Sequence, residues 1–215
     1  MTIMPEIFKI FTCILIVPII SLIINFIFSI GPLKSLKNIF IILVVPGIVI
    51  HEASHILFCK ILGTRVVSVT YFKPHSSGFQ SYVRTEEIES FLKVFFIGIA
   101  PAIVNSLSVY LILKLYTLNI LNLPLALYLM FSLIVGAKPS IQDIFVAFSV
   151  AAKYPLRVLS EFFALISPLA SIFTYQYLQT AFNINLNLTG ELTLLVLSFS
   201  PILYILFYKG EGGRF

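Results

Sequence analysis

The sequence predicts an all-α polytopic membrane protein of about six transmembrane helices, with a small β-hairpin inserted between helices two and three. Of the 215 residues, 59% are hydrophobic and 11% are charged, whereas about a quarter of a soluble domain is charged. The charges gather in short segments between long uncharged runs. One sizeable polar insertion, rich in β-branched and aromatic residues, interrupts these runs. We therefore expect a single integral membrane domain over residues 1–215.

Four uncharged runs are longer than the roughly 18 apolar residues that indicate a transmembrane helix. They cover residues 10–30, 94–113, 115–137 and 162–182. Residues 38–59 form another candidate apart from a His/Glu cluster, and residues 192–208 form a shorter sixth. The first run is too long for a signal-peptide core and no small-x-small cleavage site follows it, so we expect it to be retained.

The distribution of basic residues predicts the orientation in the membrane. With six spans, three Lys and Arg residues fall in the loops of one side and eleven fall on the side of both termini. The positive-inside rule then places both termini in the cytoplasm of a multi-pass cell-membrane protein, with the lipid bilayer as its surroundings. The net charge is +5, but the sequence contains no basic run longer than two residues. We therefore expect no nucleic-acid partner.

Two helices and the hairpin carry local signals. The segments "RVVSVTYF" and "GFQSYVR", within residues 65–84, are separated by Lys-Pro-His-Ser-Ser, which predicts a hairpin with a loop of about five residues. Pro46-Gly47 predicts a kink in the second span. Gly98, Ala102 and Ser106 repeat at helical spacing in the third span, which favours close helix packing in a membrane.

The second span contains the pattern H-E-x-x-H at His51, Glu52 and His55. Residues i and i+4 lie about one helical turn apart on nearly the same face, so both imidazoles can converge on one tetrahedral zinc ion. The glutamate is placed to act on a zinc-bound water as a general base. Ionisable groups inside a membrane are functional by default. The alternative is that the histidines bind carbonyl groups of neighbouring helices and that Glu52 forms an ion pair.

A catalytic zinc needs a third protein ligand, and three residues are weak candidates for it. Cys59 shares a face with the histidines but stands ~12 Å along the helix axis from His51. His75 sits on the expected hairpin turn, where it remains a minor alternative. Glu161 begins the fifth span four residues after Arg157, and a surface ion pair between them explains it.

Asp143 is the favoured third ligand, and it is the only aspartate in the chain. In the expected topology, the motif and Asp143 both lie in the cytoplasmic half of the bilayer. Ser140-x-x-Asp143 is also typical of a capping box at a helix start after Pro139. The two roles are compatible, and we favour the ligand.

These residues resemble the site-2 protease family of intramembrane zinc metalloproteases. That family places H-E-x-x-H in one span and an aspartate ligand two spans later. A Gly-Pro-x-x-Asn-like segment of the intervening span resembles "GIAPAIVN" through Gly98, Pro101 and Asn105. The family also has a β-hairpin after the H-E-x-x-H motif, and the hairpin expected at residues 65–84 matches it in position. In the family, glycine usually follows the aspartate directly, whereas Ile144 follows Asp143 here, which makes this chain a divergent member.

The resemblance implies a zinc-dependent intramembrane endopeptidase acting on transmembrane protein substrates. It implies a catalytic core over residues 38–152, peripheral transmembrane helices in residues 1–37 and 153–215, and a substrate-binding or oxyanion-binding role for Asn105. Two alternatives come from other classes: a catalytically silent membrane scaffold and a metal-ion transport protein. An intact Glu52 disfavours the scaffold, and the absence of an internal sequence repeat disfavours the transporter. A membrane-anchored protease with a cytoplasmic catalytic domain is excluded because the sequence predicts no such domain.

Overall fold

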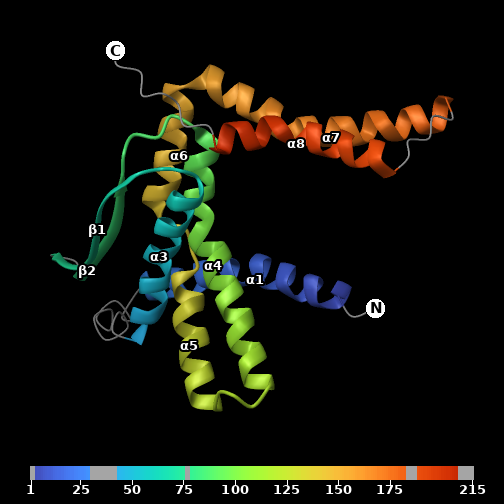
Figure 1. Cartoon of the computed structure of the whole chain (residues 1–215). Helices are drawn as coiled ribbons and strands as arrows, with labels where there is room; N and C mark the ends of the chain where they lie inside the picture. Colours follow the sequence, from blue (N-terminus) through green and yellow to red (C-terminus); the bar gives the residue numbers. More distant parts are fainter. Residues whose placement is uncertain (1–2, 30–42, 76–77, 183–187, 208–215) are drawn as a thin grey trace. The chain divides into compact units, whose positions relative to one another are not determined.

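The computed structural model describes residues 3–29, 43–75, 78–182 and 188–207. Within them, seven helices and two strands follow one another along the chain (Figure 1): α1 (Ile3–Ser29), α3 (Val45–Ile61), β1 (Val66–His75), β2 (Gly78–Thr85), α4 (Phe91–Thr117), α5 (Leu123–Gly136), α6 (Ile141–Lys153), α7 (Pro155–Phe182) and α8 (Leu188–Phe207). The chain divides into two compact units. The first comprises Met1–Glu86 and Phe96–Ile144, and the second comprises Glu87–Phe95 and Phe145–Phe215.

The described residues contain three helical segments long and apolar enough to cross a membrane: Glu6–Phe28, Phe91–Thr117 and Pro155–Tyr177. The mostly helical fold is thereby confirmed, the three apolar helices are candidates for membrane spans, and the predicted number of six spans stays a prediction. The helix α3 has 17 residues and α5 has 14, against the roughly 20 that a perpendicular span requires.

The first unit packs α1, α3, α4 and α5 around a small apolar core made by Val17, Val109, Leu133 and Ala137. Large apolar side chains on the opposite face of α1 point outward, as Phe8 and Phe11 do with exposed fractions of 73% and 62%. An apolar outer face of this kind suits a helix surrounded by lipid.

The helices α3 and α5 cross at small residues. A Cβ added at Gly47 would lie 1.9 Å from the Ser132 carbonyl oxygen, and the Gly47 amide donates a hydrogen bond of 2.7 Å to Ser132 Oγ. Pro46 lies in the first turn of α3, where a missing N–H removes no helical hydrogen bond. The helix α3 begins at Val45, directly after a turn at Val44, and residues 30–42 lie outside the described residues, so the predicted kink in a longer helix stays a prediction.

The predicted hairpin is confirmed, but its loop is shorter than expected. The strands β1 and β2 pair antiparallel from Val66 opposite Thr85 to His75 opposite Gly78, so residues 73–75 continue the strand. Pro74 is tolerated because β1 is an edge strand in this two-stranded sheet. The pairing is irregular between Thr70 and Lys73.

In the second unit, Glu161 is buried, with 1% of its surface exposed. Its Oε2 atom accepts a hydrogen bond of 2.8 Å from the Leu92 amide at the start of α4, and its Oε1 atom lies 3.5 Å from Arg157 Nε. The expected ion pair between Glu161 and Arg157 is therefore confirmed, but its expected place at the surface is wrong, because the Glu161 carboxylate is buried. The carboxylate is an internal cap for a helix N-terminus, which otherwise presents unsatisfied N–H groups.

Candidate metal centre

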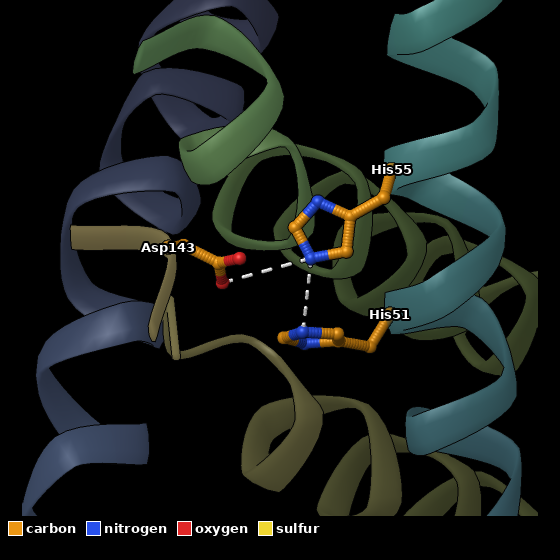
Figure 2. Close-up of side chains that lie close together, drawn as sticks. All are labelled: His51, His55 and Asp143. Atoms are coloured by element: carbon orange, nitrogen blue, oxygen red, sulfur yellow. Dashed lines mark hydrogen bonds and ion pairs between the residues drawn. The ribbon is translucent and has the colours of Figure 1, made fainter. Parts of the chain in front are cut away.

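The two histidines of the motif face each other from one helix. His51 and His55 lie one turn apart on α3, and their Nε2 atoms are 3.2 Å apart. Figure 2 shows both rings on the same side of this helix, turned toward Asp143. His55 is 6% exposed and His51 is partly buried. The spacing of the motif therefore produces the convergence that the sequence predicts.

Backbone carbonyl groups fix the tautomer of both rings. His51 Nδ1 lies 2.7 Å from the Gly136 carbonyl oxygen, and His55 Nδ1 lies 2.8 Å from the Ile97 carbonyl oxygen. A carbonyl oxygen only accepts hydrogen bonds, so each Nδ1 carries the proton. In a neutral imidazole the lone pair is then on Nε2. The structure thus aims two Nε2 lone pairs at the same small space.

Asp143 lies next to this space at the start of α6. Its Oδ2 atom is 3.7 Å from His55 Nε2, and Figure 2 shows the carboxylate facing the two rings. Asp143 Oδ2 also accepts a hydrogen bond of 2.8 Å from the Ser140 amide, while Ser140 Oγ accepts one of 3.0 Å from the Asp143 amide. These two bonds are the capping box that the sequence predicts. The cap orients the carboxylate that faces the histidines.

The donor set fits a zinc ion. One ligand atom from each of His51, His55 and Asp143 lies within 4.8 Å of the other two. Ligand atoms about 2.0–2.1 Å from a tetrahedral zinc are about 3.3 Å apart, close to the observed separation of the two nitrogens. Two lone pairs and one carboxylate without a cation between them would repel each other. A catalytic zinc site commonly has two imidazoles and a carboxylate as its three protein ligands, and water takes the fourth position.

Glu52 lies between the histidines in sequence and is 5% exposed. Its Oε1 atom accepts a hydrogen bond of 2.7 Å from Ser81 Oγ on β2. The hairpin therefore reaches the motif, and this contact has no signal in the sequence pattern because a serine in a strand is commonplace.

Asn105 lies behind the centre on α4 and has no exposed surface. Its Nδ2 atom donates to the carbonyl oxygens of Pro101, at 3.1 Å, and Gly136, at 3.3 Å. The Gly136 carbonyl is the group that also holds His51. Within the part of the chain that the structure describes, Asn105 Oδ1 has no hydrogen-bond partner. Its expected contact with a substrate stays a prediction. Its observed contact is with the Gly136 carbonyl group, which in turn positions His51.

Two of the three weaker ligand candidates, Cys59 and Glu161, do not join this group. Cys59 is buried with no exposed surface, two turns along α3 from His51. His75 ends β1. Glu161 belongs to the second unit, where it binds Leu92. Of the residues the sequence brought forward as ligands, the structure gathers His51, His55 and Asp143.

The sequence suggests bonds from the histidines to carbonyl groups of neighbouring helices only as an alternative to metal binding, and it does not identify the carbonyl groups of Gly136 and Ile97. A carbonyl has no residue-type signal, but Ser132-x-x-x-Gly136 is a small-x-x-x-small pattern of the kind that brings membrane helices together. That pattern indicates where α3 and α5 approach, and hence which carbonyl His51 meets.

Comparison with known proteins supports this chemistry. Residues 44–159, just over half of the chain, match the sequence family DUF3267, whose description is "Putative zincin peptidase". The matched range contains the motif, the hairpin and Asp143. No curated protein and no solved structure matches the chain.

Proposed function

The chain belongs to the DUF3267 family, described as "Putative zincin peptidase", and we propose that it is a zinc-dependent endopeptidase that cleaves membrane proteins within or near their transmembrane segments. The observation that carries the proposal is the convergence of His51, His55 and Asp143 beside Glu52. We assign His51, His55 and Asp143 as zinc ligands and Glu52 as the general base.

Bound zinc supplies Lewis-acid chemistry, because it lowers the pKa of water and polarises a carbonyl group. The residues of the chain do the rest. Glu52 takes a proton from the attacking water and later delivers it to the leaving amine nitrogen. The carbonyl groups of Gly136 and Ile97 hold the imidazoles in the tautomer that presents Nε2. Such outer partners raise the basicity of a histidine ligand and fix its orientation.

The membrane setting supports a transmembrane substrate. Three helices are long and apolar enough to span a bilayer, and the multi-pass topology with cytoplasmic termini is part of this proposal. A peptide bond inside a helix is protected by backbone hydrogen bonds, so the substrate has to unwind before cleavage. The hairpin has only two strands, and an open strand edge is a surface to which an extended peptide can add as a further strand.

The first test measures zinc in the full chain purified in detergent, after loading with zinc and removal of the excess. We expect about one zinc per chain in the wild type and in Glu86→Ala, which removes an exposed carboxylate paired with Arg65. Asp143→Ala should lose most of the metal. A wild type that holds no zinc would refute the metal centre and favour a scaffold.

The second test measures cleavage of fluorescein-labelled casein, an unfolded polypeptide, by the same preparations. Glu52→Gln should hold zinc like the wild type while its turnover falls by at least about 100-fold, as expected for loss of a general base. A wild type that holds zinc and cleaves nothing would contradict peptidase activity and would favour metal transport, which a zinc flux measurement in liposomes then checks.

A further inference from the structure

The strand β2 contacts the candidate active site through the side chain of Ser81. Ser81 Oγ donates a hydrogen bond of 2.7 Å to Glu52 Oε1. We propose that Ser81 is a positioning residue for the general base Glu52, so that the hairpin is a working part of the catalytic unit. This inference rests on the proposed function, which assigns the role of base to Glu52.

The register of the hairpin explains why Ser81 is the residue that points at Glu52. Gln80 pairs with Lys73 and Tyr82 pairs with Thr70. Two β1 residues, Tyr71 and Phe72, therefore lie opposite the one β2 residue Ser81. This is the arrangement of a β-bulge, which bends a strand, re-aims a side chain and is common beside active sites.

The alternation of the strand leaves no substitute for Ser81. Successive side chains of a strand point to opposite faces, so Tyr82 faces away from the side that Ser81 occupies. A slip of one residue would place a neighbouring side chain against α3. The hairpin register and the bulge therefore select a small hydroxyl donor for this position.

The hydrogen bond has a clear chemical consequence. A bond from a hydroxyl to a carboxylate is charge-assisted and stronger than one between neutral groups. It restrains rotation of the Glu52 carboxylate, which is 5% exposed, and it leaves the second oxygen to take the proton. Outer partners of this kind typically change activity by about 10–100-fold when removed.

The test uses the zinc-loaded full chain in detergent micelles, with fluorescein-labelled casein as the probe. Ser81→Ala should lower kcat by about 10–100-fold with KM and zinc content unchanged. Ser81→Thr, which keeps the hydroxyl, should restore most of the turnover. Ser68→Ala removes an exposed serine hydroxyl from β1, so it should behave like the wild type. A wild-type kcat in Ser81→Ala would overturn the inference.

An infrared measurement separates this inference from the proposed function. Glu52→Gln identifies the carboxylate band of Glu52 by its disappearance from the spectrum. We expect that band to shift in Ser81→Ala and to stay in place in Ser68→Ala. An unshifted band would overturn the inference even if the wild type cleaves casein. A wild type that does not cleave casein would overturn the proposed function, and the shifted band would still show that Ser81 holds the carboxylate.

Discussion

Gly47 of α3 and Gly136 of α5 lie so close that a Cβ added at Gly136 would be 2.5 Å from the Gly47 carbonyl oxygen. His51 follows Gly47 by one helical turn, and its Nδ1 atom lies 2.7 Å from the Gly136 carbonyl oxygen. Because neither glycine has a side chain, the Gly136 carbonyl group of α5 can approach the His51 imidazole of α3. The close helix crossing and the orientation of the proposed metal ligand His51 are one structural feature.

Replacing either glycine should damage the metal centre. In Gly47→Ala the new Cβ would lie 1.9 Å from the Ser132 carbonyl oxygen, which is backbone and cannot rotate away. Forced movement of packed helices costs about 1–3 kcal/mol or more, and it separates His51 from Gly136. We expect a lower unfolding temperature in detergent and at least about tenfold weaker zinc binding for Gly47→Ala and Gly136→Ala.

Gly98→Ala is the matched control for these variants. Its Cβ would lie 3.4 Å from Asp143 Cβ, an ordinary van der Waals distance. We expect unfolding and zinc affinity close to those of the wild type. If Gly98→Ala and Gly136→Ala lose zinc equally, the α3–α5 crossing has no special role in placing His51.

Removal of the metal should destabilise the fold. The three donors come from α3 and from the start of α6, so a bound ion joins two elements of the first unit. A ligand at 100 times its Kd stabilises the folded state by about 2.7 kcal/mol. We expect a chelator to lower the unfolding temperature of the wild type, and added zinc to restore it. Asp143→Ala should show little response to either, and an equal response in this variant would contradict the ligand assignment.

Asn105 distinguishes support of the centre from contact with substrate. It is fully buried and shares the Gly136 carbonyl with His51. Asn105→Ala leaves a cavity and removes that hydrogen bond, which costs about 1–3 kcal/mol. We therefore expect a lower unfolding temperature and about tenfold weaker zinc binding. Unchanged zinc binding and unfolding with reduced casein turnover would instead support the substrate role, and unchanged turnover would exclude it.

Glu161 should matter for stability in a way that exposed carboxylates do not. Glu161→Ala leaves the Leu92 amide without its acceptor and Arg157 without its buried partner. Loss of such a bond costs about 1–3 kcal/mol, so thermal unfolding in detergent should move to lower temperature. Zinc content should be unchanged, because Glu161 is not part of the metal centre.

Glu87→Gln is the exposed counterpart of that variant. Hydrogen bonds from Lys153 and Tyr154 lower the pKa of Glu87. The stability it contributes is therefore present at neutral pH and is lost as the pH falls through the lowered pKa. Because the carboxylate is exposed to solvent, that contribution is small. We expect Glu87→Gln to unfold almost like the wild type at pH 7, and a loss as large as that of Glu161→Ala would contradict this ranking.

Much of the fold and of the candidate site follows from local patterns in the sequence. The motif spacing predicts the convergence of His51 and His55, since a helix places i and i+4 on one face. The capping box predicts the start of α6 near Asp143. The alternation of β-branched and aromatic residues predicts the hairpin. Each of these features is decided within a few residues of chain.

The missing parts depend on contacts between distant segments. The number of spans stays a prediction, because three helical segments within the described residues are long and apolar enough to cross a membrane. An apolar run by itself does not distinguish a helix that faces lipid from a helix that is buried in the protein. The hairpin loop is shorter than expected because Lys73, Pro74 and His75 extend the strand despite their low strand propensity. Burial of Glu161 depends on a helix start that lies 69 residues earlier in the chain. No local pattern specifies such a meeting.

The helix α1 offers a last prediction, because its polar residues bind the segment that leads to Asp143. Ser21 Oγ donates to the Val135 carbonyl oxygen at 3.0 Å and accepts from the Lys138 amide at 3.1 Å. Ser21→Ala leaves the Lys138 amide without this acceptor, while the Val135 carbonyl oxygen keeps a hydrogen bond of 3.2 Å from Asn25 Nδ2. Loss of the bond from the buried amide costs about 1–3 kcal/mol and releases the turn between α5 and α6. We expect lower stability and weaker zinc binding, measured by thermal unfolding and by competition with a zinc chelator.

Thr12→Ala provides the comparison within the same helix. Thr12 Oγ is exposed and donates only to the Phe8 carbonyl oxygen of its own helix, at 2.8 Å, so its loss should leave unfolding and zinc binding near the wild-type values. If Ser21→Ala behaves in the same way, α1 is a peripheral helix, as the sequence predicts. If only Ser21→Ala weakens zinc binding, α1 is part of the support of the metal centre, because its hydroxyl fixes the turn that carries the third ligand.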